Sequence, residues 1–68
     1  MTQQTYTVTG MTCGHCVRSV TEEVSEIDGV TDVAVDLPTG VVTVTSEKDL
    51  GVDAVRAAVE EAGYQLTA

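Results

Sequence analysis

The sequence predicts one α+β domain of 68 residues, with strands and helices in the order β-α-β-β-α-β. Three observations support this prediction. Several short segments alternate apolar and polar residues, as half-buried strands do. Two longer segments repeat apolar residues at helical spacing. Glycine or proline separates most of these segments, at points where the chain reverses. The length leaves room for a single domain, which we assign to residues 1–68.

The first predicted element is a strand that covers Thr5–Thr9. Tyr6 and Val8 alternate with threonines there, which is typical of a strand with one buried face. Residues 10–14 break this alternation with two glycines and predict a loop.

A helix is predicted next, over residues 15–27. Its apolar residues recur at intervals of three and four, which places them on one face of a helix. These residues are Val17, Val20, Val24 and Ile27. The remaining positions are mainly polar, so we expect one buried stripe and an exposed remainder. Gly29 supplies the backbone freedom that commonly ends a helix.

The second half of the chain predicts a hairpin, a helix and a short strand. Residues 32–37 and 41–45 alternate in the manner of strands, and Pro38-Thr39-Gly40 between them predicts a turn. Residues 52–62 predict a helix followed by a glycine stop, and residues 64–67 predict a last strand. The apolar stripe of this helix consists of Val52, Val55, Val59 and Ala62.

Two helices with one apolar stripe each can both cover the same face of a four-stranded antiparallel sheet. The predicted fold class is therefore α+β, a ferredoxin-like βαββαβ sandwich. Its other face, rich in threonine and aspartate, should be open to water. A core of valine and alanine without Phe or Trp suits thin two-layer packing. It does not suit a deep pocket for an organic substrate, so we predict that the chain is not an enzyme.

The net charge of the chain limits the classes of partner that it can bind. Eleven Asp and Glu against three Lys and Arg give a formal net charge of −8. This charge repels phosphate backbones and anionic membrane surfaces, so we predict no nucleic-acid partner and no membrane docking. A cation or a basic protein surface fits better. We interpret Glu22, Glu23 and Glu26 as a solvated helix face, with a docking role as the alternative.

No targeting or membrane segment is evident. Residues 1–5 lack the positive and apolar regions of a signal peptide, and no segment approaches the roughly 20 apolar residues that span a bilayer. We therefore expect a complete cytoplasmic protein without membrane insertion, and a fragment of a larger protein is the alternative. In a reducing compartment, the two cysteines favour metal binding or redox chemistry over a structural disulfide.

Cys13 and Cys16 flank the junction between the predicted loop and the first helix. Their spacing lets both sulfurs face one point, and the helix N-terminus favours anionic thiolates. Two soft thiolates suit Cu(I), which accepts low coordination numbers. A structural zinc site usually needs four ligands, whereas the chain has two cysteines and only one histidine, His15.

Residues 10–16, Gly-Met-Thr-Cys-Gly-His-Cys, resemble the GMTCxxC signature of the heavy-metal-associated domain family. The resemblance extends from Tyr6 to Leu66 and includes the element order. The family contains bacterial Cu(I) chaperones, which this chain resembles most, and N-terminal domains of copper-transporting P-type ATPases. The resemblance implies that Cys13 and Cys16 bind Cu(I). It also implies transfer of the ion to such an ATPase by thiolate exchange.

Three more residues are expected to support the site. The resemblance implies that Met11 packs beneath the loop, with a thioether ligand as the alternative. It places Tyr64 near the metal, where this residue either shields the ion or covers the core edge. His15 is expected to be exposed and not a ligand. One hypothesis is that it adjusts the ionisation of the thiols, or supplies a third ligand where copper bridges two otherwise monomeric chains.

Other functions fit parts of the sequence. One alternative is an excised metal-binding domain of such an ATPase. Another keeps the same fold and changes the ion to Hg(II), Zn(II) or Cd(II). Zinc would prefer a harder ligand beside the cysteines, but Thr12 precedes Cys13. A dithiol oxidoreductase also uses a CxxC motif. That class fits less well because this chain is shorter than a thioredoxin-like domain, lacks an aromatic residue before Cys13 and carries its one proline, Pro38, in a turn.

Overall fold

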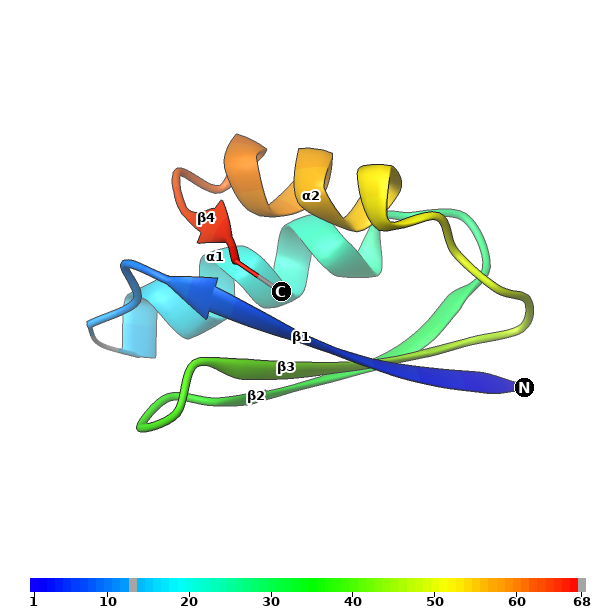
Figure 1. Ribbon diagram of the computed structural model, residues 1–68, viewed down its shortest axis with the longest axis horizontal. Coiled ribbons are helices and arrows are strands. Elements are labelled where there is room, and N and C mark those ends of the chain that lie inside the picture. The colour runs from blue at the N-terminus through cyan, green and yellow to red at the C-terminus, as the bar shows by residue number, and fades with distance from the viewer. Residues whose placement is uncertain (13, 68) are drawn as a thin grey trace.

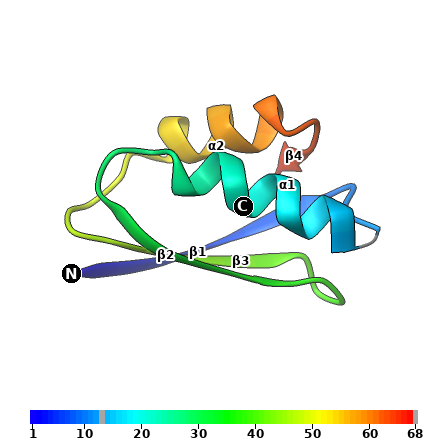
Figure 2. The same ribbon diagram turned by 180° about the vertical axis from the view of Figure 1, so that it is seen from behind.

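The computed structural model describes residues 1–12 and 14–67. Its elements are β1 (Thr2–Thr9), α1 (Gly14–Ser25), β2 (Val30–Asp36), β3 (Val41–Ser46), α2 (Val52–Glu61) and β4 (Gln65–Leu66). The strands form one antiparallel sheet in the order β2-β3-β1-β4. Both helices lie on the same face of this sheet, as opposite views show (Figures 1 and 2). The predicted α+β class and element order are confirmed.

The central strands of the sheet are β1 and β3. They pair along most of their length, from Thr2 opposite Ser46 to Thr7 opposite Val41. In contrast, β4 pairs with β1 only at Val8 and Thr9. The described part of β4 therefore covers only the C-terminal end of β1, the end that leads into the cysteine motif.

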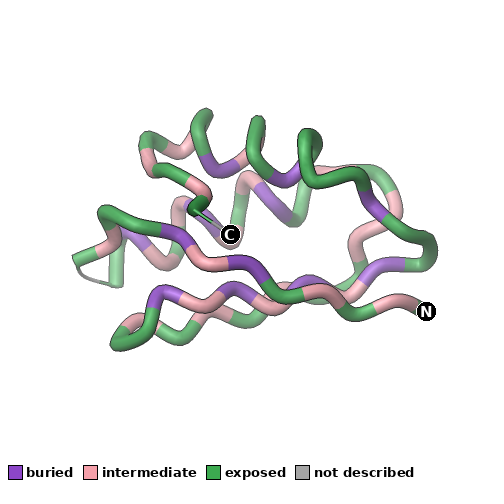
Figure 3. Tube along the Cα trace, in the orientation of Figure 1, coloured by how far each residue is buried: buried purple, intermediate pink, exposed green. Residues whose placement is uncertain are grey.

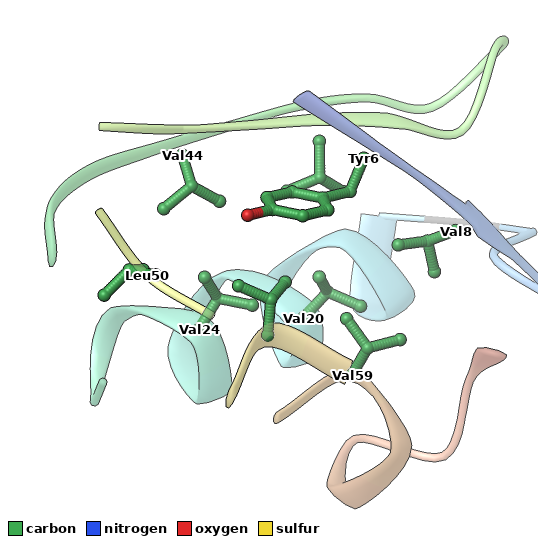
Figure 4. Packing of buried hydrophobic residues seen from close by; sticks show 9 residues of the cluster. Tyr6, Val8, Val20, Val24, Val44, Leu50 and Val59 are labelled. Carbon is green, nitrogen blue, oxygen red and sulfur yellow. The ribbon is translucent and has the colours of Figure 1, made fainter. Parts of the chain in front are cut away.

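The core lies between the sheet and the two helices and consists mainly of valine. Its fully buried members are Val20, Val24, Val42, Val44, Val55 and Val59. Tyr6, Val8 and Leu50 complete it (Figure 4). Burial alternates along β1 and β3, as predicted, and leaves the polar face of the sheet to water (Figure 3). Each fully buried valine contributes about 1.5–3 kcal/mol through removal of apolar surface from water.

Two positions in the predicted helical stripes are wrong. Val52 is 45% exposed, because it is the first residue of α2 and Leu50, just before the helix, fills the core instead. The backbone N–H of Leu50 donates to the Gln4 side chain at 3.3 Å, which holds this loop against β1. In α1 the buried residue of the first turn is Cys16, whereas Val17 is only half-buried. The buried stripe thus advances by four residues, from Cys16 to Val20 and Val24.

The ends of several elements also differ from the prediction. The strand β1 begins three residues earlier, at Thr2, and α1 ends at Ser25. The N–H groups of Glu26 and Ile27 bond to carbonyls three residues back, so the last turn tightens there. Of the described residues, neither helix is long and apolar enough to cross a membrane.

Candidate metal site

The motif segment, defined as residues 10–16, connects β1 to the first turn of α1. Gly10 turns the chain out of β1 with a φ of +96°, a conformation that favours glycine. Cys13, one of the two predicted ligands, lies outside the described residues. The remaining predicted site residues are described, and each has a definite place at this end of the sheet.

Cys16 lies in the first turn of α1 with 9% of its surface exposed. The predicted helix over residues 15–27 includes Cys16, but its apolar stripe did not; the residue lies on the buried side of α1, one turn before Val20. The hydroxyl of Thr12 lies 3.9 Å from its sulfur, close enough for a weak hydrogen bond in which either atom donates. The N-terminus of α1 carries the positive end of the helix dipole, which favours a thiolate.

Tyr64 approaches the motif segment from the other half of the chain. The N–H groups of Gly63 and Tyr64 bond to the carbonyls of Glu60 and Val59, the Schellman pattern that ends a helix. A Cβ added to Gly10 would lie 3.3 Å from Cδ1 of Tyr64. The half-buried Tyr64 side chain therefore rests on the backbone where the motif segment begins.

Met11 and His15 differ in their surroundings. Met11 is half-buried and packs against the core, whereas His15, the second residue of α1, is exposed. The prediction that neither residue binds metal stays a prediction. In the described part of the chain, no three His, Cys, Asp or Glu side chains are grouped closely enough to hold a metal ion. No pocket is present there either.

Two contacts at this site were not anticipated. The spacing of Thr12 and Cys16 by four residues, across a helix start, is a local signal that could have indicated their contact. The contact between Gly10 and Tyr64 has no such signal, because 54 positions separate the two residues in the sequence.

The sequence pattern of the heavy-metal-associated domain matches residues 5–65. The chain belongs to this family. The match covers every strand and helix at least in part and includes the whole motif segment.

Relatives within the heavy-metal-associated domain family support the assignment. The copper chaperone CopZ of Bacillus subtilis is 42% identical over 67 residues, which cover 97% of both chains. A solved CopZ metallochaperone has a TM-score of 0.90 at 36% identity, covering 97% of this chain and 100% of its own. The copper-binding domain of HMA7, a P-type ATPase, has a TM-score of 0.88 at 28% identity, covering 98% of this chain and 92% of its own. The ferredoxin-like fold is that of the family.

Proposed function

We propose that this chain is a cytoplasmic copper chaperone that carries one Cu(I) ion between the thiolates of Cys13 and Cys16. The supporting observation is the 42% identity to a copper chaperone across 97% of both chains. The placement of Cys16 at the N-terminus of α1 supports the same function, because a metal-binding thiolate is stabilised there.

Binding exchanges two thiol protons for one ion. Two neutral thiols and one Cu(I) give a bis-thiolate complex with a net charge of −1 and release two protons. The first turn of α1 offsets this negative charge, and the burial of Cys16 limits access of water to its sulfur. Met11 and Tyr64 support the segment by packing, and His15 does not bind the ion.

The low coordination number of Cu(I) allows the ion to be transferred to another protein. A two-coordinate ion leaves space for a thiolate from the CxxC motif of a copper-transporting P-type ATPase. The three-coordinate intermediate then loses one chaperone thiolate, and a second exchange completes the transfer. Copper stays Cu(I) throughout, so no electron donor is needed. The chain acts as a carrier rather than an enzyme in copper homeostasis and is monomeric without metal.

The deciding experiment is an anaerobic titration of the reduced protein with Cu(I) against a competing chelator. Zn(II) is titrated in parallel, and the double variant Cys13→Ser/Cys16→Ser serves as the control. We expect one Cu(I) per chain, much tighter binding of Cu(I) than of Zn(II), and loss of binding in the double variant. Weak Cu(I) binding, or binding that survives the double substitution, would exclude the proposed site and favour the dithiol redox function.

The similarity to the HMA7 domain supports a second candidate, an N-terminal metal-binding domain of a copper ATPase. Both candidates bind Cu(I), so the titration does not distinguish them. Immunodetection of the protein in extracts of the native cell distinguishes them by size and by cell fraction. A chaperone gives a band near 7.1 kDa in the soluble fraction, whereas a domain of an ATPase gives a much larger band in the membrane fraction.

A further inference from the structure

The chain after α2 forms a strap, defined as residues 63–67, which lies beside the C-terminal end of β1 (Figure 1). Its strand β4 pairs with β1 at two positions. One further bond joins the N–H of Thr67 to the carbonyl of Thr7 at 2.8 Å. Gln65 and Thr67 are exposed, so water reaches these hydrogen bonds. Short pairing near a chain end, with hydrogen bonds open to water, is typical of segments that open locally.

The apolar contacts of the strap are limited too. Tyr64 and Leu66 are half-buried against the core. Each of the two helices, by comparison, contributes two fully buried valines. Because apolar burial stabilises in proportion to the area removed from water, the strap should open at a lower free energy than either helix.

The rest of the fold keeps its own contacts when the strap opens. On the β3 side of β1, the N–H of Val8 donates to the carbonyl of Gly40 at 2.8 Å, which holds the end of this strand. Gly63, at the junction of α2 and the strap, is exposed and has a φ of +97° with nothing within 4 Å of an added Cβ. It can serve as a hinge, because glycine changes its backbone angles at little steric cost.

The strap also holds the start of the motif segment. Residue-by-residue pairing of β1 with β3 ends at Thr7, so Thr9 and Gly10 lie beyond it. Both contact the strap instead. Thr9 pairs with Gln65. The Cδ1 atom of Tyr64 lies 3.3 Å from the Cβ position of Gly10. Opening of the strap therefore releases the first residue of the motif segment.

Cys16 lies at the other end of the motif segment and is 9% exposed. Thiolate exchange requires a second sulfur to approach the ion that Cys16 holds, and this degree of burial leaves little room for the approach. The motif segment therefore has to move before transfer. Because the strap holds the start of this segment, opening of the strap permits the movement.

We propose that the strap controls access to the sulfur of Cys16. It swings away about Gly63 while the sheet and both helices stay folded, releases Gly10, and so lets the motif segment expose the thiol to an incoming thiolate. The inference deepens the proposed function and rests on it only for the ion and the incoming thiolate. Opening of the strap and exposure of the thiol need no metal, so they are tested without it.

Hydrogen exchange tests whether the strap opens by itself. The amide of Thr67 is bonded from the strap to β1, and the amide of Val8 is bonded on the other side of the same strand. Relative to their intrinsic rates, we expect the Thr67 amide to exchange at least about tenfold faster than the Val8 amide. Equal protection of the two would mean that the strap opens only with the whole fold, and would overturn the proposal.

Alkylation of the metal-free Cys13→Ser protein by iodoacetamide measures access to the Cys16 thiol. Leu66→Ala removes apolar contact from the strap and should raise the alkylation rate about tenfold. Gln65→Val, at an exposed position of β4, favours the strand and should lower the rate about threefold. The matched control is Ile27→Ala, which removes a half-buried side chain after α1, away from the strap.

The control separates local from global opening. Ile27→Ala should lower the stability of the whole fold in urea but change the alkylation rate by less than about twofold. Equal acceleration by Ile27→Ala and Leu66→Ala would mean that the thiol is reached through global unfolding, and would overturn the proposal. An unchanged rate in both Leu66→Ala and Gln65→Val would overturn it as well.

A second experiment, with both cysteines present, connects the strap to copper. Release of Cu(I) to an excess of a competing chelator should be faster in Leu66→Ala and slower in Gln65→Val, with one ion bound per chain in each. Unchanged release rates, where alkylation rates do change, would overturn control of transfer by the strap. A chain that binds no Cu(I) would instead contradict the proposed function, and the alkylation rates would still decide whether the strap controls access to Cys16.

Discussion

The side chain of Tyr64 lies on the backbone of Gly10, so closely that a Cβ on the glycine would be 3.3 Å from the tyrosine Cδ1. Gly10 has a φ of +96°, and the Schellman hydrogen bonds at the end of α2 fix the position of Tyr64. The beginning of the motif segment is therefore joined to the end of α2 at a point with little room for a side chain.

This contact predicts the effect of Gly10→Ala on stability. The substitution forces a residue with a Cβ into a positive φ, which costs about 1–2 kcal/mol, and also pushes against Tyr64. Gly63→Ala is the matched control because Gly63 has a φ of +97° with nothing within 4 Å of the added Cβ. We expect the free energy of unfolding, measured in urea without metal, to fall more for Gly10→Ala than for Gly63→Ala.

A double-mutant cycle isolates the side-chain contact. In a Tyr64→Ala background the added Cβ at Gly10 meets no ring, so the two alanine substitutions should cost nearly the same. An unchanged difference between them in that background would mean that Tyr64 does not press on Gly10.

The fold could be predicted from the sequence where a single period dominates. The alternation of Tyr6 and Val8 and the spacing of Val20 and Val24 each identify one buried face, and the structure buries these residues. The helical spacing wrongly placed Val52 in the buried stripe of α2, because the spacing does not indicate which turn of the helix first contacts the core. It failed at Cys16 because a cysteine in a metal motif was not counted as an apolar residue.

The site could be predicted only in part. The motif identifies Cys13 and Cys16 by local spacing, whereas the place of Tyr64 came from a family resemblance. No pattern in the sequence relates Tyr64 to Gly10, because a glycine stop after α2 fixes only the local direction of the chain. Contacts between distant segments depend on the length of β1 and on the short pairing of β4. Periodicity gave the end of β1 at Thr9 but neither its start at Thr2 nor the bounds of β4.

The hydroxyl of Tyr6 makes stability depend on alkaline pH. It is buried, 7% of Tyr6 being exposed, and no atom of the described residues hydrogen-bonds to it. Figure 4 shows the ring inside the core. Burial raises the pKa of Tyr6, and the negative charge of Asp49 raises it further. Because tyrosine in the unfolded state titrates near pH 10, the contribution of Tyr6 to stability should be fully present below that pH and be lost as the pH rises above it.

Substitution tests this assignment. Tyr6→Phe removes an unpaired polar group, so it should raise the free energy of unfolding at neutral pH by up to about 1 kcal/mol. The variant should also lose less stability above about pH 10, because the unfolded state no longer gains from ionisation of Tyr6. Tyr64→Phe is the control, and its stability should still fall above that pH through Tyr6. A loss of stability at neutral pH in Tyr6→Phe would indicate that the hydroxyl has a hydrogen-bond partner in solution.

We predict that Gly40, in the turn between β2 and β3, cannot be replaced by a residue with a side chain without loss of stability. This buried residue has a φ of +75°, and an added Cβ would lie 2.5 Å from the carbonyl oxygen of Val8. The N–H of Val8 also donates to the Gly40 carbonyl at 2.8 Å, so the two backbones cannot separate without losing this bond. Gly40→Ala should lower the free energy of unfolding by more than about 2 kcal/mol.

Gly51→Ala is the control for this prediction. Gly51 has a φ of −68° and open space around its Cβ position, so alanine there should change stability by less than about 1 kcal/mol. Similar effects of the two substitutions in thermal and urea unfolding would show that the turn relaxes away from β1.

His15 provides a test of how many ligands the copper site needs. It is exposed on the outer side of the first turn of α1, whereas Cys16 is buried on the inner side of the same turn. If the two thiolates suffice, His15→Gln should still bind one Cu(I) per chain. Its affinity should lie within about threefold of that of the unsubstituted protein, a change of less than about 1 kcal/mol in the free energy of binding. The measurement is the chelator competition under anaerobic conditions, repeated at several protein concentrations. A loss of tenfold or more at all concentrations would make His15 a ligand within one chain. A loss that appears only at high concentration would place it in a copper-bridged pair, because only there does a second chain bring another imidazole to the ion.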